Sequence, residues 1–260
     1  MDLNLQDKVI IVTGGTRGIG GAISRSLSLE GAIPVFVGRN KEGGEVLERE
    51  LNSKNQKGIY IEGDLNKEGE CRGIVEEVIN KLGKIDALVN NAGVNDNVGL
   101  ESGTPEEFKI SLFNNVNHYY EMTHYCLPFL KTTKGNILNI SSKVALSGQG
   151  GTSGYAAAKG AQLALTREWA AELLSYGIRV NAILPAEVMT PLYKSWLDSF
   201  EDPAEKRKKI ETKIPLGNRM TTDMEIAATA LFIISSRSSH TTGQFIIPDG
   251  GYIHLDRSLT

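Results

Sequence analysis

The residues best suited to chemistry in this chain are Tyr155 and Lys159, which stand four positions apart in an alanine-rich run that favours a helix. On a helix, this spacing puts both side chains on one face, with Cβ atoms roughly 5–6 Å apart. A free tyrosine has a pKa near ~10, and a neighbouring ammonium favours the phenolate and lowers that pKa. Tyr155 can then exchange a proton with a substrate oxygen that the Ser142 hydroxyl, thirteen positions earlier, also holds. The alternative is a Tyr–Lys pair without function on a helix surface.

A glycine-rich turn lies near the N-terminus, between a β-branched run over residues 8–13 and a helical pattern that extends to Leu29. Strand, glycine turn and helix place backbone N–H groups and the positive end of a helix against a phosphate. The strict GxGxxG spacing is absent, because the glycines fall as Gly14-x-x-x-Gly18-x-Gly20. The turn therefore indicates a dinucleotide site only in combination with other motifs.

Strand and helix patterns alternate along the rest of the chain. They predict strands over residues 33–37, 59–61, 87–89, 136–140, 179–184 and 244–247, and helices over 42–53, 68–82, 105–130, 155–175 and 223–234. The segment 186–216 has the character of a substrate lid with two short helices. This alternation predicts an α/β fold: one Rossmann-type domain over residues 1–260, with a doubly wound parallel sheet and helices on both faces. Ligands bind such sheets beyond the carboxyl ends of the strands, where the motifs fall.

Composition narrows the range of partners. The chain has 260 residues and a net charge of -3, which gives no general attraction to nucleic acid or to an anionic membrane. Cys71 and Cys126 are far apart and have neither metal-ligand nor disulfide-framework spacing, which favours a reducing compartment. There is no signal-like N-terminus, and no apolar stretch approaches the ~20 residues of a membrane span. We therefore expect a cytoplasmic protein without a metal site that acts on a small molecule.

Several motifs in this order resemble the short-chain dehydrogenase/reductase superfamily over essentially the whole chain: Thr13-Gly14-x-x-x-Gly18-x-Gly20, Asn90-Asn91-Ala92-Gly93, Ser142, Tyr155-x-x-x-Lys159 and Asn181-Ala182-x-x-Pro185. The resemblance implies hydride transfer with a nicotinamide cofactor. Tyrosine is then the acid/base, lysine lowers its pKa and holds the nicotinamide ribose, and serine positions the substrate. The fourth catalytic residue of the family, an asparagine that anchors a water linking the lysine to solvent, maps onto Asn117, with Asn114 and Asn115 as close alternatives. The other reading of Asn117 is an asparagine bonded within its helix.

The resemblance also implies a set of cofactor contacts: Gly14, Thr16, Arg17, Gly18, Ile19, Gly20, Arg39, Asp64, Leu65, Asn91, Ala92, Gly93, Tyr155, Lys159, Pro185, Val188 and Thr190. The second predicted strand is followed by Arg39 instead of an acid, and an arginine there accommodates the 2′-phosphate of NADP. Arg17 is a second cation for the same phosphate. NADP is therefore the expected cofactor, and NAD is the alternative if both arginines are ordinary surface residues. Asp64 either binds the adenine amino group or simply forms a turn.

The residues expected around the substrate are mostly polar: Asn95, Ser142, Gln149, Tyr155, Glu187 and Trp196. A pocket for a steroid or fatty-acyl chain would be lined mainly by apolar residues. Glu187 lies just beyond Pro185, in a stretch that departs from the usual family pattern. A carboxylate there suits a polyhydroxylated ligand, unless Glu187 faces solvent.

Longer stretches are similar to bacterial L-fucose dehydrogenases of this superfamily, among them residues 93–96, 118–120, 140–143, 148–150, 166–170, 185–193 and 249–257. This likeness implies oxidation of the anomeric hydroxyl of L-fucose, and of related aldoses such as D-arabinose, to the lactone. The superfamily also implies a homotetramer. Two other functions stay open: a carbonyl or 3-oxoacyl reductase with the same catalytic residues, and a catalytically silent nucleotide-binding regulator.

Overall fold

A single seven-stranded sheet organises the molecule, in the order β3-β2-β1-β4-β5-β6-β7. Every neighbouring pair is parallel. The strands are β1 (Val9–Thr13), β2 (Ile33–Gly38), β3 (Ile59–Glu62), β4 (Ala87–Asn90), β5 (Asn136–Ile140), β6 (Arg179–Ile183) and β7 (Phe245–Ile246). The predicted doubly wound parallel sheet is confirmed.

The computed structural model describes residues 2–255. The predicted domain of residues 1–260 therefore extends past the described part at both ends. Asp256 and Arg257, which belong to the C-terminal motif, lie outside the described residues.

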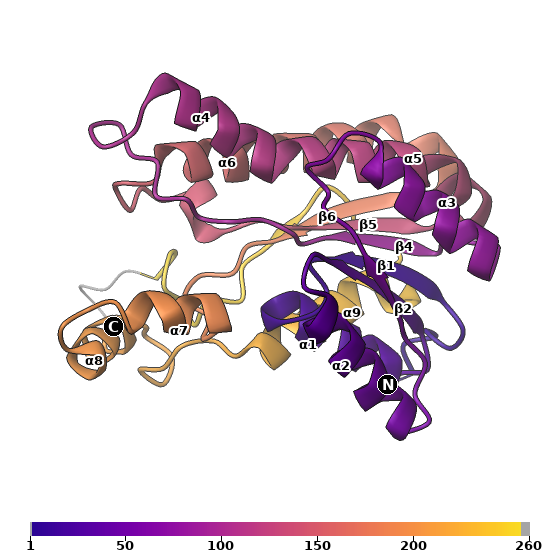
Figure 1. Ribbon diagram of the computed structural model, residues 1–260, viewed down its shortest axis with the longest axis horizontal. Coiled ribbons are helices and arrows are strands. Elements are labelled where there is room, and N and C mark those ends of the chain that lie inside the picture. The colour runs from indigo at the N-terminus through magenta and orange to yellow at the C-terminus, as the bar shows by residue number, and fades with distance from the viewer. Residues whose placement is uncertain (1, 256–260) are drawn as a thin grey trace.

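Helices cover both faces of the sheet, as Figure 1 shows. One layer contains α3 (Glu70–Leu82), α4 (Pro105–Leu112), α5 (His118–Thr133) and α6 (Ser153–Glu172). The other contains α1 (Gly18–Leu29), α2 (Lys41–Ser53) and α9 (Asp223–Ile234). Two short helices, α7 (Pro191–Leu197) and α8 (Pro203–Glu211), lie to one side of these layers and form the predicted lid segment. Within residues 2–255, no helix is long and apolar enough to cross a membrane.

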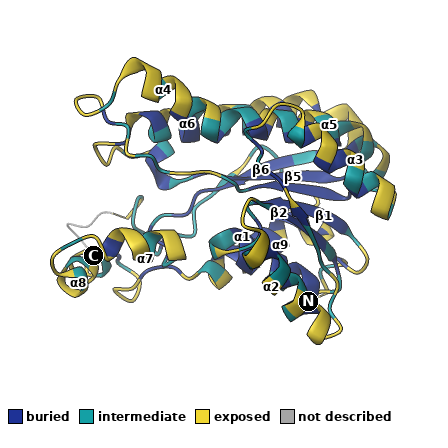
Figure 2. Cartoon of the chain, in the orientation of Figure 1, coloured by how far each residue is buried: buried dark blue, intermediate teal, exposed yellow. Residues whose placement is uncertain are grey.

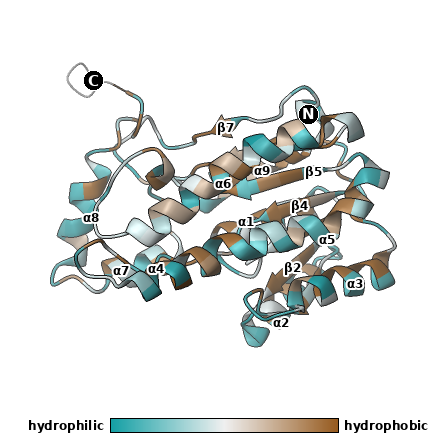
Figure 3. Cartoon of the chain, turned by 90° about the horizontal axis from the view of Figure 1, so that it is seen from above, coloured by the Kyte–Doolittle hydropathy of each residue, from teal (hydrophilic) through white to brown (hydrophobic). Residues whose placement is uncertain are grey.

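The central strands are buried on both faces, which is why β1 and most of β4 are apolar runs without alternation, whereas β5 also buries two asparagines. In Figure 2 these strands are dark blue, and in Figure 3 they are mostly brown, whereas the outer sides of the helices are mostly hydrophilic. One core cluster includes Tyr119 and Leu130 of α5, and another includes Ile23 of α1 and Ile226 of α9. The sheet is therefore a rigid support whose carboxyl ends can hold a site.

The long helix predicted over residues 105–130 is interrupted. A π-helical segment, Phe113–Asn117, separates α4 from α5. The start of α4 is fixed by a capping box between Thr104 and Glu107. A π-turn inserts one extra residue into a helix, and such insertions often lie at functional sites. Because the apolar pattern continues on both sides, the sequence predicts the helix but not the change of register.

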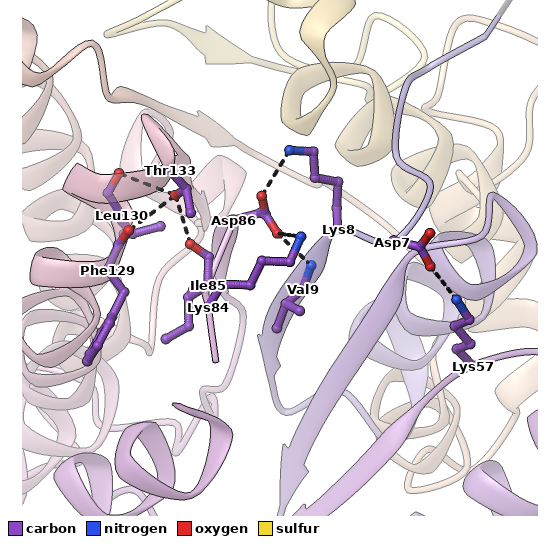
Figure 4. Close-up of polar contacts among 10 residues, drawn as sticks. All are labelled: Asp7, Lys8, Val9, Lys57, Lys84, Ile85, Asp86, Phe129, Leu130 and Thr133. Carbon is purple, nitrogen blue, oxygen red and sulfur yellow. Dashed lines mark hydrogen bonds and ion pairs between the residues drawn. The ribbon is translucent and has the colours of Figure 1, made fainter. Parts of the chain in front are cut away.

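The amino ends of the strands are held by a separate polar cluster, which Figure 4 shows. The Asp86 carboxylate accepts hydrogen bonds from the Val9 amide and the Lys8 ammonium, both at 2.9 Å, and pairs with Lys84 at 3.1 Å. Burial raises the pKa of Asp86, but the Val9 amide and the two lysines outweigh burial, so the pKa lies below its ordinary value. This cluster joins β1 to β4 at the edge opposite the site.

Candidate active site

A cavity of about 1450 Å³ opens at the carboxyl ends of the strands and beside the lid segment. All the predicted cofactor and substrate residues line it, together with Ser142, Tyr155 and Lys159. Asn117 is the one predicted site residue that does not. The sheet therefore brings together motifs from the whole length of the chain, as expected for a doubly wound sheet.

The backbone of the glycine turn has a conformation and close contacts that a side chain at these positions would prevent. Gly14 and Gly18 have φ angles of 62° and 54°, in the left-handed region that favours glycine. A Cβ at Gly20 would lie 2.2 Å from the Gly14 carbonyl oxygen and 2.5 Å from Asn91 Nδ2. Arg17, which precedes α1, makes no side-chain hydrogen bond to the first turn of that helix. The turn therefore presents backbone N–H groups to the cavity, and it fits the pyrophosphate of a dinucleotide.

Replacing Gly20 with alanine is expected to destabilise the protein by about 1–3 kcal/mol and to weaken dinucleotide binding, because the new methyl group meets backbone atoms that cannot rotate away. Thermal unfolding and a fluorescence titration with reduced nicotinamide cofactor measure the two effects. Gly73→Ala in α3 is the matched control, since a Cβ there meets nothing within 4 Å. Cofactor binding at wild-type strength in the Gly20 variant would show that the turn does not approach the ligand.

The predicted catalytic residues come together at the end of β5. Tyr155 lies in the first turn of α6, where the nearby Ser142 hydroxyl acts to lower the pKa of its phenol. The Lys159 ammonium lies 5.4 Å from the centroid of the Tyr155 ring and donates to the Ile140 carbonyl at 3.0 Å. Tyr155 is partly exposed to the cavity, whereas Lys159 is only 3% exposed. The arrangement can hold a substrate oxygen between two hydroxyls, with a cation behind them.

Burial governs the charge states of this pair. It raises the pKa of Tyr155 to about 12, although the Ser142 hydroxyl partly offsets this. It also lowers the pKa of Lys159 to about 7. The sequence predicts that lysine lowers the pKa of the tyrosine, whereas here the loss of water around both groups is the larger effect, because burial disfavours each charged form.

The asparagine connected to this group through hydrogen bonds is Asn115, and not Asn117 as the sequence predicts. The Asn117 amide points away and donates to Glu121 Oε1 at 2.8 Å. Asn115 is buried, and its Oδ1 accepts from the Val94 amide at 2.8 Å. Its backbone carbonyl accepts from Gln162, which in turn binds Lys159. The π-helical segment accounts for the difference, since it changes which residues of this helix face the site.

Glu187 is buried instead of facing solvent. It is 9% exposed and forms an ion pair with Lys143, the residue that follows Ser142. Its second oxygen accepts from the Tyr193 hydroxyl at 2.6 Å. Sequence reasoning missed Lys143 and Tyr193, which also line the cavity. Together these contacts connect the end of β5, the loop after β6 and the first turn of α7.

Two of the other predicted substrate residues lie in loops. Asn95 Oδ1 accepts from the Asn97 amide at 3.2 Å, and Gln149 Nε2 donates to the Thr152 hydroxyl at 3.3 Å. Gln149 is exposed and Asn95 is partly exposed, so both retain access to the cavity. Their positions leave polar groups around the place where a substrate would meet Tyr155.

An aromatic cluster forms the lid side of the cavity. The Trp196 ring lies 5.2 Å from that of Tyr193 and 4.9 Å from that of Phe200, in edge-to-face contacts. Trp196 is 40% exposed and lines the cavity. The Thr190 hydroxyl caps α7 by accepting from the Tyr193 amide at 3.2 Å. Two aromatic rings of α7, those of Tyr193 and Trp196, therefore line this side of the cavity.

The other end of the cavity contains the predicted cofactor cations. Arg17 and Arg39 are both exposed and line the cavity. The Asp64 carboxylate accepts from the Asn66 amide at 3.3 Å, which is the contact of a turn-forming aspartate. Within residues 2–255, no group of three His, Cys, Asp or Glu residues is placed to hold a metal ion.

Comparisons of the sequence and of the structure with known proteins agree on one family. The family model described as enoyl-(acyl carrier protein) reductase, of the short-chain dehydrogenase/reductase type, matches residues 14–253. An L-fucose dehydrogenase of Rattus norvegicus is 36% identical over 94% of this chain and 88% of its own. The 3-oxoacyl-[acyl-carrier-protein] reductase FabG of Thermotoga maritima is 32% identical over 96% of this chain and 100% of its own. The crystal structure of Cj0485 dehydrogenase superposes with a TM-score of 0.94 at 48% identity, over 100% of this chain and 99% of that one.

Proposed function

The chain belongs to the short-chain dehydrogenase/reductase superfamily, and on that premise we propose that it oxidises the anomeric hydroxyl of L-fucose and related aldoses, such as D-arabinose, to the lactone. The observation that carries this proposal is the polar lining around Ser142 and Tyr155. Glu187, Lys143, Asn95 and Gln149 border the cavity there, and hydroxyl-rich ligands need such donors and acceptors. The similarity to L-fucose dehydrogenase supports the same substrate class.

In the proposed reaction, Ser142 and Tyr155 hold the anomeric oxygen, and Tyr155 takes its proton. A nicotinamide cofactor held by the predicted residues, among them Val188 and Thr190, would supply the acceptor for the hydride of the anomeric carbon; loss of that hydride and of the hydroxyl proton would leave the lactone carbonyl. Lys159 lies behind Tyr155, where its ammonium favours the phenolate that starts the reaction. The lid would exclude water from this step, with Trp196 against the less polar face of the sugar.

We propose NADP as the preferred cofactor, because Arg17 and Arg39 both line the cavity and their neighbours Thr16 and Gly38 are in contact. Arg39→Ala is then expected to weaken NADP binding about tenfold or more, since an exposed charge-assisted contact to a phosphate is lost, and to leave NAD binding nearly unchanged. Dissociation constants for both cofactors, measured by fluorescence titration, give the ratio. Arg49→Ala on α2 is a control arginine outside the cavity-lining set. An equal loss for both cofactors would assign Arg39 a role in folding only.

A second function has support from the same cavity. A 3-oxoacyl reductase would use Ser142, Tyr155 and Lys159 in the reverse direction, with Tyr155 donating its proton to a carbonyl. The FabG of Thermotoga maritima matches this chain at an identity close to that of the sugar enzyme. The high pKa of Tyr155 also suits a proton donor.

An activity panel separates these functions. Purified protein is mixed with NADP or NAD and each of L-fucose, D-arabinose, D-glucose and the C2 and C4 epimers of L-fucose, and reduced nicotinamide is followed by absorbance. We expect turnover of L-fucose and D-arabinose, and steep loss with epimers, because an inverted hydroxyl leaves polar groups of the site unpaired. Acetoacetyl thioester with NADPH is the reductive arm. Rapid reduction there, without aldose oxidation, would favour the reductase, and cofactor binding without turnover would favour a regulator.

A homotetramer and a cytoplasmic location stay predictions.

A further inference from the structure

One buried polar side chain next to the catalytic group has no role in the reaction described above. Gln162 lies one helical turn after Lys159 in α6 and is 0% exposed. Its Oε1 accepts from the Lys159 ammonium at 3.2 Å, and its Nε2 donates to the Asn115 carbonyl at 2.8 Å. A single carboxamide therefore spans the lysine and the asparagine carbonyl.

The Asn115 end of this bridge and the backbone end of the Gln162 side chain are both fixed. Asn115 belongs to the π-helical segment, and its side chain is held on two sides, by the Val94 amide at 2.8 Å and by the Ser111 carbonyl at 2.9 Å. The backbone carbonyl of Gln162 accepts from the Thr166 hydroxyl at 2.7 Å. Because neither end can move far, the amide can take up only a narrow range of orientations.

We propose that Gln162 is a positioning residue for Lys159, which holds the ammonium toward Tyr155 and fills the space between that ammonium and the Asn115 carbonyl. The proposal rests on the proposed dehydrogenase function. In the superfamily pattern, a water in this region links the lysine to solvent. A carboxamide accepts from an ammonium and donates to a carbonyl, but it does not readily take up and release a proton. In this chain the bridge would therefore orient the lysine instead of conducting its proton.

Gln162 is an important support for the positive charge of Lys159, because few of the other groups around the ammonium stabilise it. Tyr155 faces it from α6, and the Tyr119 ring lies 5.7 Å from its nitrogen. His118 also approaches from α5, but burial lowers the pKa of His118 to about 4, so that it is neutral at neutral pH. Among the described residues, no carboxylate makes a hydrogen bond to Lys159; its recorded acceptors are the Ile140 carbonyl and Gln162.

The test is to replace Gln162 with methionine, which keeps the length of the side chain and removes both the donor and the acceptor. A hydrogen bond to the charged form of a group favours that form, so its loss should lower the pKa of Lys159 by about one unit. Titration of lysine labelled with ¹³C at Cε, followed by NMR, reads this pKa without needing turnover. The variant Lys159→Arg identifies the resonance of Lys159, since that signal alone is missing from its spectrum.

Activity supplies a second readout. With less ammonium at a given pH, the phenolate loses support, and the pH at which oxidation begins should move up by about one unit, with about tenfold less turnover at neutral pH. The cofactor KM should change little. Ser238→Ala, a buried hydroxyl outside the cavity-lining residues, is the control. It removes a buried polar group that contacts neither Lys159 nor Gln162, and it should lower the melting temperature without moving the pH profile.

The outcomes are distinct. A Lys159 pKa in Gln162→Met equal to that of the wild type overturns the proposal, whatever the activity. If the methionine variant does not fold, Gln162→Leu in the same titration decides. A wild type that turns over no alcohol or carbonyl rejects the proposed function, but the NMR titration still tests the position of Gln162.

Discussion

Replacement of Tyr155 by phenylalanine is expected to lower turnover by ~10²–10⁴-fold, the range usual for a lost general acid or base. The phenyl ring preserves the packing at the start of α6, but the proton acceptor is gone, and the Ser142 hydroxyl alone cannot replace it. Dinucleotide binding should stay close to that of the wild type, because the glycine turn and both arginines lie at the other end of the cavity. Steady-state kinetics and a cofactor titration measure the two quantities.

Tyr176→Phe is the matched control for this variant. Tyr176 is 43% exposed, lies outside the cavity-lining set and makes a cation–π contact with Lys131. Its loss of a hydroxyl should leave kinetics unchanged. If Tyr155→Phe retained most of its activity, Tyr155 would not be the acid/base, and the proton would need another acceptor.

Most of the fold could be predicted, because the strands are short, mostly apolar runs separated by helical patterns. The Gly14 and Gly18 turn, for example, follows from glycine spacing alone, and the structure gives both glycines positive φ angles. The register of the helix after β4 could not be predicted. The π-helical segment Phe113–Asn117 leaves the apolar periodicity intact on either side, so three nearby asparagines could not be told apart.

Two parts of the site depend on contacts that spacing does not encode. Lys143 and Glu187 lie 44 positions apart, and a lysine after a serine gives no sign that it is buried. The pKa of Tyr155 depends on how much water the folded chain removes, which a motif cannot state. Gln162, in contrast, could have been found, since it follows Lys159 by three positions and therefore lies on the same helix face.

Replacement of Lys159 by methionine is expected to abolish most activity. The stability of this variant relative to the wild type is expected to be greater at pH 6 than at any higher pH. Lys159 is 3% exposed, and burial lowers its pKa to about 7 from an ordinary value of 10.5. An ammonium at this position is therefore a cost to the folded state, which methionine removes. Such a cost is typical of a group kept for function.

The sign of the pH dependence follows from proton binding. Between about pH 7 and pH 10.5 the unfolded chain binds a proton at Lys159 that the folded chain has lost, so the stability of the wild type rises with pH in this interval. The slope is at most about 1.4 kcal/mol per pH unit. The methionine variant lacks this dependence on pH. The stability that it gains over the wild type by removing the ammonium is therefore full below pH 7 and is gone above pH 10.5.

One loss opposes the gain but does not change with pH. Without Lys159, Gln162 Oε1 loses its donor, which costs about 1–3 kcal/mol for a buried acceptor. The Ile140 carbonyl keeps a partner, because the Tyr119 hydroxyl donates to it at 2.9 Å. The decisive quantity is therefore the difference in unfolding free energy between variant and wild type as a function of pH, measured by urea denaturation at pH 6, 8 and 10. Lys67→Met is the control, since Lys67 is exposed and its ammonium stays in water in both states. A difference that does not vary with pH would mean that Lys159 keeps its charge in the folded protein, and that its neighbours compensate for burial.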